Sequence, residues 1–158
     1  MKLAQELAAL FDRDLARLEQ ELRAFPDTET LWMVAPGVSN AAGTLALHLE
    51  GNLREYIGRQ LGHHDYTRDR AREFSARGVP QQELLERVGA LRGTIPAVIR
   101  DLAPEALAEA YPEPYNGAAI TTQQFLVHLL SHFNYHLGQI DYLRRFTSGA
   151  GAIQLATL

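Results

Sequence analysis

The sequence contains no cysteine. This absence excludes disulfide bonds, thiolate nucleophiles and cysteine-ligated zinc. Long apolar runs are missing too, since no window approaches the roughly 18 consecutive apolar residues that a membrane span needs. The opening stretch, MKLAQELAALFDRDLARLEQ, carries charges every few residues, unlike a signal peptide. We therefore expect a cytoplasmic protein that does not associate with membranes.

An excess of basic residues is also absent. The chain has 15 Lys and Arg against 19 Asp and Glu, which gives a formal net charge of −4. Such a chain has no overall positive field to attract phosphates, and it shows neither a dense Lys/Arg run nor an aromatic-and-basic strand motif. We therefore expect no nucleic-acid partner.

Sustained strand alternation is the last absence, whereas helical periodicity is abundant. Apolar residues recur every three or four positions in four segments, over residues 3–25, 41–61, 80–102 and 121–146. Ser39 and Asn40 are placed to cap the second segment, and Thr121 with Gln124 fits a capping box before the fourth. With 158 residues, of which 46% are hydrophobic, the chain is predicted to form one domain over residues 1–158. The expected fold is an all-α four-helix bundle.

Two long connections, 62–79 and 103–120, separate the later helices. Charge alternates in sign over residues 68–72, which predicts a solvated loop, with anion binding as the alternative. The segments 32–40 and 111–117 either form the rim of a pocket or pack the bundle ends through Trp32, Tyr111 and Tyr115.

The fourth predicted helix carries histidines at positions 128, 132 and 136. Steps of four residues place neighbouring side chains on one helix face, so two imidazoles one turn apart are able to reach one metal ion. Apolar residues flank this face, and an unpartnered buried polar group costs about 1–3 kcal/mol. Metal ligation would remove that cost. The spacing fits the pair His128 and His132 as well as the pair His132 and His136.

His48 lies on the apolar face of the second predicted helix and is the candidate third ligand. Three imidazoles would leave an open coordination position, which is typical of catalytic rather than structural sites. Asn52, one turn after His48, and Gln139, three residues after His136, are candidates for the second shell. The alternative is a plain bundle whose buried histidines and amides are satisfied by internal hydrogen bonds.

Other catalytic patterns are missing. The sequence has no HExxH motif, no paired ExxH motifs of the ferritin-like di-iron kind, no GxSxG elbow and no phosphate-binding glycine loop. A metal ion held by histidines is therefore the remaining candidate chemistry.

Two of these segments resemble the DinB-like proteins. HLLSHFNYHLGQIDYLRR is similar to that family's last helix, and NAAGTLALHLEGNLREYI is similar to its second helix. TRDRAREFSARG resembles the segment that follows in a branch of unknown function. The resemblance implies a four-helix bundle, often dimeric, with His48, His132 and His136 as ligands and His128 as a core, site-wall or second-shell residue.

The same resemblance implies a function. Characterised members of the DinB-like family include thiol transferases and a thiol-dependent isomerase. The resemblance therefore implies a metal-dependent transferase or hydrolase that activates a thiol or water. The expected ion is zinc or nickel, with iron or manganese as alternatives. The expected partners are a second copy of the chain and a small-molecule substrate, such as a low-molecular-weight thiol. The alternative function is a non-catalytic, metal-binding, stress-associated dimer.

Overall fold

The computed structural model describes residues 2–157. Within that range the chain forms seven α-helices and one π-helical segment, and two isolated bridges are the only β-structure. The elements, in chain order, are α1 Lys2–Arg23, α2 Thr28–Trp32, α3 Ala42–Leu53, η1 Arg54–Arg59, α4 Arg70–Ser75, α5 Gln81–Arg100, α6 Pro104–Ala108 and α7 Thr122–Ser148.

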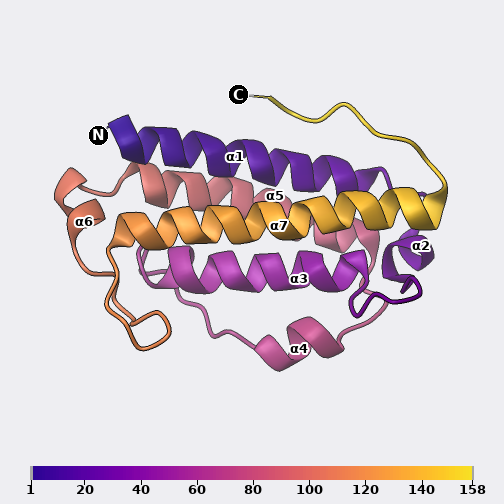
Figure 1. The fold of residues 1–158 in the computed structure, drawn as a ribbon, viewed down its shortest axis with the longest axis horizontal. Coiled ribbons are helices and arrows are strands. Elements are labelled where there is room, and N and C mark those ends of the chain that lie inside the picture. Colours follow the sequence, from indigo (N-terminus) through magenta and orange to yellow (C-terminus); the bar gives the residue numbers. More distant parts are fainter. Residues whose placement is uncertain (1, 158) are drawn as a thin grey trace.

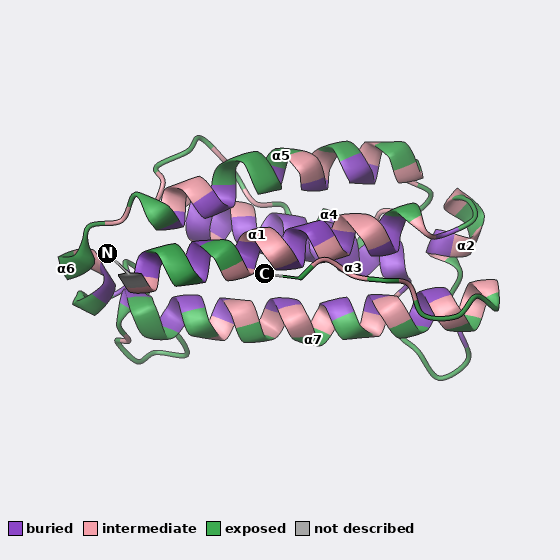
Figure 2. Ribbon diagram, turned by 90° about the horizontal axis from the view of Figure 1, so that it is seen from above, coloured by how far each residue is buried: buried purple, intermediate pink, exposed green. Residues whose placement is uncertain are grey.

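Four helical rods lie side by side along the long axis of the molecule (Figure 1). α1 packs against α5, and α7 packs against both α1 and α3, while the short α4 covers the outer side of α3. α1, α5 and α7 each turn a buried face inward and an exposed face outward, whereas all residues of α3 are buried (Figure 2). The predicted all-α fold is confirmed, and its long helices correspond to the four segments with helical periodicity.

The apolar stripe of α1 shows why these segments fold as they do. Phe11, Leu15, Leu18 and Leu22 recur at helical spacing, and all four are completely buried in the core. Removing such side chains from water stabilises the fold by roughly 1.5–3 kcal/mol each. The helix therefore forms as part of the bundle rather than from intrinsic propensity alone.

The start of α3 differs from the prediction. Ser39 and Asn40 were expected to cap this helix, but its N-cap is Ala41, which makes no side-chain capping bond. The backbone of Ala41 is extended, so the chain enters the helix one residue later than the two capping candidates. α3 then continues without a break into η1, where the amide of Gln60 donates to the carbonyl of Glu55. The helical rod thus ends close to the predicted boundary at residue 61.

The two long connections contain short helices that periodicity does not reveal. α4 lies within residues 62–79 and is capped by Asp69, whose side chain accepts a hydrogen bond from the amide of Arg72 at 2.9 Å. α6 lies within residues 103–120. The predicted solvation of residues 68–72 holds for residues 69–72, which are exposed, but not for Arg68, which is partly buried. The predicted loop is wrong from residue 70 on, where the chain enters α4. The local cap at Asp69 and the packing of α4 on α3 both stabilise this segment.

Both ends of α7 match the sequence signals. The side chain of Thr121 accepts a hydrogen bond from the amide of Gln124 at 3.1 Å, as the capping motif predicts. Gly149 ends the helix with φ +69°, a left-handed conformation that favours glycine. Across residues 2–157, none of the helices combines the length and apolar character that a membrane crossing requires.

Candidate metal centre

The candidate site lies between α3 and α7. α3 supplies His48, which is buried, and α7 supplies His132 and His136, which are half-buried and one turn apart. The ring of His48 lies 5.2 Å from that of His132 and 5.3 Å from that of His136, measured between centroids. The rings of His132 and His136 are 4.6 Å apart. The structure therefore brings together the three histidines that the family resemblance selects.

The distances between the ring nitrogens fit a single ion. The Nε2 atoms of His48 and His132 are 3.3 Å apart, and one ligand atom from each of the three histidines lies within 4.8 Å of the others. Two nitrogens bound to a tetrahedral zinc ion at about 2.05 Å are separated by about 3.3 Å. The three side chains thus form a cluster that is able to hold a divalent metal.

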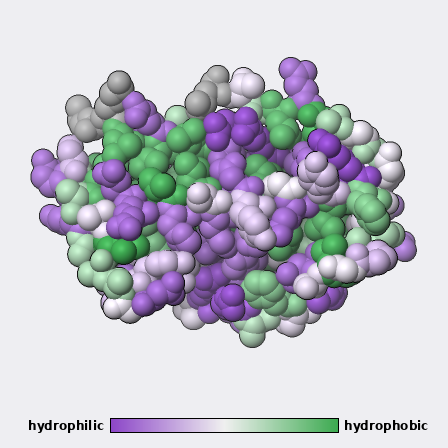
Figure 3. All heavy atoms as spheres, viewed as in Figure 1, coloured by the Kyte–Doolittle hydropathy of each residue, from purple (hydrophilic) through white to green (hydrophobic). Residues whose placement is uncertain are grey.

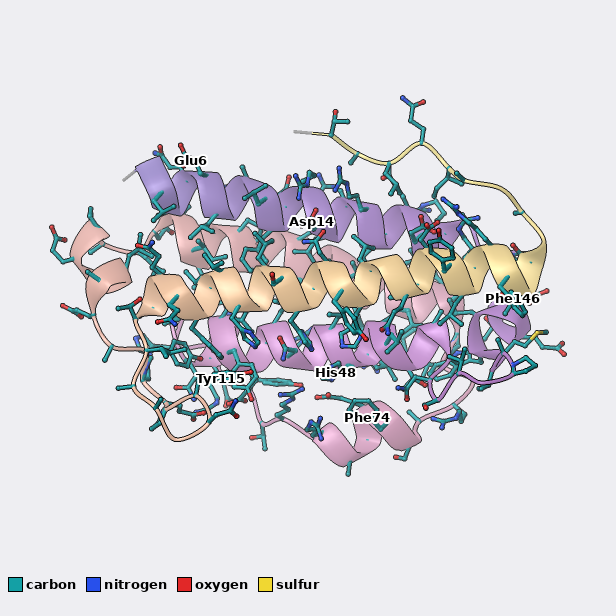
Figure 4. All side chains as sticks on the ribbon, in the orientation of Figure 1. Glu6, Asp14, His48, Phe74, Tyr115 and Phe146 are labelled. Carbon is teal, nitrogen blue, oxygen red and sulfur yellow. The ribbon has the colours of Figure 1, made fainter. Side chains whose placement is uncertain are left out.

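His48 is oriented by a carboxylate from α4. Its Nδ1 donates to Oε2 of Glu73 at 3.0 Å, which leaves Nε2 with a lone pair that faces His132. Glu73 is itself held by Arg68, whose Nε donates to Oε1 at 2.7 Å and whose Nη2 donates to Oε2 at 2.9 Å. Figure 4 shows His48 on α3 facing Phe74 on α4, and their rings are 4.9 Å apart. A histidine fixed in this way by a carboxylate is typical of metal sites.

Burial alone would raise the pKa of Glu73. Hydrogen bonds from His48 and Arg68, together with the charge of Arg68, outweigh that effect and lower the pKa of this carboxyl group. Glu73 is therefore ionised at neutral pH. Its negative charge increases the electron density that His48 offers at Nε2.

Sequence reasoning missed Glu73 and Arg68, although one signal was available. Gly51 lies inside α3, where glycine is about 1 kcal/mol less favourable than alanine. A Cβ atom on Gly51 would lie 2.0 Å from Oε1 of Glu73. This glycine therefore marks a close approach by another element, which is the alternative meaning of a glycine inside a helix.

His136 has its own partner on the same helix. Its Nδ1 donates to Oε1 of Gln139 at 2.7 Å, so its Nε2 also carries a lone pair. This hydrogen bond has the geometry expected of a residue that orients a metal ligand. The role of Gln139 toward a metal ion stays a prediction. Asn52 is buried on α3, one turn after His48, and its role stays a prediction as well.

At neutral pH, protons do not compete with a metal ion for the ring nitrogens of His132 and His136. Burial, followed by the neighbouring His136 and His48, lowers the pKa of His132 to about 4. Burial also lowers the pKa of His136, even though Gln139 favours its charged form. Nδ1 of His132 is buried and has no hydrogen-bond partner within residues 2–157. Among the described residues it shares this lack of a partner with Oε1 of Glu21 and Oγ1 of Thr44, and it is the only one of the three that lies in the histidine cluster.

His128 lies outside this cluster. Its ring lies 4.6 Å from that of Tyr115, at a tilt of 47°, and 6.4 Å from the ring of His132. Tyr111 is buried and donates its hydroxyl to the carbonyl of Tyr56 at 2.8 Å, so it packs the bundle end. Trp32 likewise donates to the carbonyl of Val79 at 2.9 Å. Tyr111 and Trp32 therefore pack the interior instead of forming a rim around the three histidines, whereas Tyr115 is 38% exposed and contacts His128.

Comparison with known proteins agrees with this architecture. The family model of the DinB superfamily matches residues 10–140, so the chain belongs to that superfamily. None of the curated proteins matches the chain.

Two solved structures share the fold. A DinB-like protein from Bacillus cereus ATCC 10987 aligns with a TM-score of 0.68 and 16% identity, over 89% of this chain and 91% of its own. A conserved protein from Enterococcus faecalis aligns with a TM-score of 0.74 and 18% identity, over 95% of this chain and 99% of its own. At these identities the likeness concerns the fold alone.

Proposed function

We propose that the protein is a metal-dependent enzyme that holds one divalent ion between His48, His132 and His136. The proposed reaction is the attack of a thiol or a water on an electrophilic small molecule, as in an S-transferase. The proposal rests on one observation above all, the 3.3 Å between the Nε2 atoms of His48 and His132 in a three-histidine cluster. We propose zinc or nickel first and iron or manganese as alternatives, because imidazole accepts most of these ions.

An ion with three protein ligands keeps an open position, at which it would lower the pKa of a thiol or water. The chain contributes the orientation of the ligands. Glu73 and Arg68 fix the ring of His48, and Gln139 fixes that of His136. These contacts would hold the ligand rings in place for an ion.

The protonation states in the cluster suit a cation. His132 and His136 are uncharged at neutral pH because burial lowers both pKa values, and Glu73 adds a negative charge behind His48. Arg68 balances that charge on the far side of Glu73. A divalent cation therefore meets neutral nitrogen donors without first displacing protons from the α7 histidines.

The three histidines differ in how far they are exposed. His48 is 6% exposed and is covered by Phe74 of α4, whereas His132 and His136 are half-buried. A substrate would therefore approach from the side of the two α7 histidines. The residues around His48 keep water away from the rear of the cluster.

A turnover screen tests the proposal. The protein, purified without a polyhistidine tag and loaded with zinc or nickel, is mixed with cysteine, glutathione or water and with chlorodinitrobenzene or an activated ester. We expect metal-dependent turnover that His132→Ala abolishes. His128→Ala, one turn away on the same helix and outside the cluster, is the matched control and keeps its activity.

The second candidate function is a non-catalytic, metal-binding protein. The described residues support it in one respect, because no group that touches the cluster is an obvious acid or base apart from Glu73, which is already paired with Arg68. One tightly bound ion per chain without turnover of any thiol or water substrate favours this candidate.

A further inference from the structure

A groove opens where the segment after α2 meets the C-terminal end of α7. We call it the end groove, and it is lined by residues 35–40 together with Leu45, Gln139, Tyr142, Leu143 and Phe146. Its volume is about 520 Å³. Small-molecule sites have volumes of roughly 300–1,000 Å³, so the end groove has the size of a ligand site.

The chemistry of the lining selects the kind of ligand. Among the described residues, those that line the end groove are all uncharged, and most are apolar. The cavity between α3 and α4 is different, because its lining includes Arg54, Arg72, Arg77 and Arg87 as well as four acidic residues. A charged ligand would find no partner in the end groove, because burying an unpaired charge is unfavourable. The end groove therefore suits an uncharged, largely apolar molecule better than the charged cavity between α3 and α4 does.

The end groove begins beside the metal centre. Leu45 lies three residues before His48 on α3, and Gln139 lies three residues after His136 on α7. The two helices run in opposite directions, so both steps lead toward the same end of the molecule (Figure 1). Gln139 belongs to both places, because it lines the groove and accepts the hydrogen bond from His136 at 2.7 Å. One helical turn, about 5.4 Å, therefore separates the groove from the three histidines.

Large apolar side chains are left exposed around the end groove. Val38 is 39% exposed, Tyr142 71% and Phe146 72%. Figure 3 shows hydrophobic residues interspersed with hydrophilic ones at the end of the molecule where α2 and the end of α7 lie, a second hydrophobic area toward the opposite end, and hydrophilic residues across the middle of the same face. A concave apolar surface with a few polar groups is typical of a binding site.

We propose that the end groove binds the uncharged, apolar part of the substrate and directs its reactive end to the three histidines. The substrate class is an aliphatic or aromatic molecule with an electrophilic group at one end. Ser39, Asn40 and Gln139 provide the few hydrogen bonds that fix its orientation. The inference rests on the proposed function for the reactive end, but the apolar binding itself does not require the ion.

The first experiment uses the metal-free protein. Phenylnaphthylamine, an uncharged dye that fluoresces in apolar surroundings, is titrated against the wild type, Val38→Asp and Val127→Asp. Val127 is a valine that is 50% exposed on α7 and does not line the groove, so it is the matched control. We expect one dye per chain, with affinity at least about tenfold weaker in Val38→Asp because the charge is unpaired, and unchanged in Val127→Asp. Phe146→Ser, at an exposed side chain, repeats the test if Val38→Asp does not fold.

The second experiment tests the connection to the metal centre. Acetohydroxamate and its butyl, hexyl and octyl homologues are titrated calorimetrically against the zinc-loaded protein. Their affinity is expected to rise about threefold to fourfold for each methylene that enters the groove, and Val38→Asp is expected to remove this rise without changing the affinity for acetohydroxamate.

The outcomes separate the two proposals. Equal affinity for all hydroxamates overturns the connection to the metal centre, and absence of dye binding overturns the groove as a ligand site. A wild-type dimer that excludes the dye, and that Val38→Asp converts to a monomer, also overturns it, because the occupant is then a second copy of the chain. If no ion binds, the proposed function fails, while the dye titration still decides whether the groove binds apolar molecules.

Discussion

Two clusters of buried polar side chains lie on α7, and they are completed in different ways. Arg144 is completely buried, and it donates to Glu21, Asp141 and the carbonyl of Gly151. Around His132 and His136, by contrast, ring nitrogens face other ring nitrogens, and Nδ1 of His132 has no partner in the described part of the chain. Each cluster keeps one buried atom without a partner among the described residues, Oε1 of Glu21 in the first and Nδ1 of His132 in the second. The first is closed in the sense that its charges are paired within the protein, whereas the nitrogen donors of the second are open to a cation.

This difference teaches how burial is to be interpreted. Both clusters lie in a low-dielectric interior, where an unpaired polar group is unfavourable. The charge of Arg144 is paired within the protein, so that cluster has a structural role. In the histidine cluster a hydrogen bond between the Nε2 atoms of His48 and His132 would still leave Nδ1 of His132 without a partner, whereas an ion would use ring nitrogens of all three histidines as ligands.

The largest expected effect concerns the closed cluster. Replacing Arg144 with Met leaves the carboxylates of Glu21 and Asp141 without their buried partner, and breaking such a pair destabilises a protein by roughly 3–5 kcal/mol. Chemical denaturation measures this loss. Arg145→Met is the control, because Arg145 bonds the same Asp141 from a half-exposed position, where a pair contributes about 0–1 kcal/mol. Similar losses in both variants would contradict the distinction.

A smaller effect is expected at the support of the open cluster. Glu73→Gln keeps the shape of the side chain but removes the charge behind His48, so the affinity for zinc is expected to fall about 10–100-fold. Competition with a chromophoric chelator measures the affinity. The surface carboxylate of Glu83, which pairs with Arg87, provides the control Glu83→Gln. An unchanged affinity in Glu73→Gln would mean that Glu73 does not support a ligand.

The smallest effect is expected at Gly51. Gly51→Ala introduces a Cβ atom 2.0 Å from Oε1 of Glu73, and the flexible carboxylate has to move away. Displacing the carboxylate is unfavourable, whereas alanine favours the helix by about 1 kcal/mol over glycine. Because the two effects oppose each other, thermal stability should change little. The affinity for zinc is expected to fall about tenfold, the lower end of an outer-shell loss. A full loss of folding would show instead that the backbones of α3 and α4 cannot separate.

The long helices could be predicted from the sequence because each buries a continuous stripe. α1 and α7 are the plainest cases, and the cap of α7 was readable from Thr121 and Gln124. The candidate ligands could also be predicted from the sequence. The spacing on one helix suggested two pairs of histidines, and the family resemblance selected the pair His132 and His136 together with His48.

The support of the site could not be predicted in the same way. α4 has six residues, too few for a periodic pattern, and its sequence RAREFS resembles a solvated charge run. Only the tertiary fold brings Glu73 onto His48 and Arg68 onto Glu73. The burial of Arg144 depends on Glu21, which is 123 residues away in the sequence. Such long-range pairing leaves no local signal.

The most direct test of the account is the metal content of the protein purified without a polyhistidine tag, stripped with a chelator and then titrated with zinc. We expect one ion per chain for the wild type and for His128→Ala. His132→Ala should lose more than about 100-fold in affinity, beyond what an outer-shell residue contributes. Less than about a tenth of an ion per wild-type chain, or equal affinities in His132→Ala and the wild type, would contradict the central claim that these imidazoles share one ion.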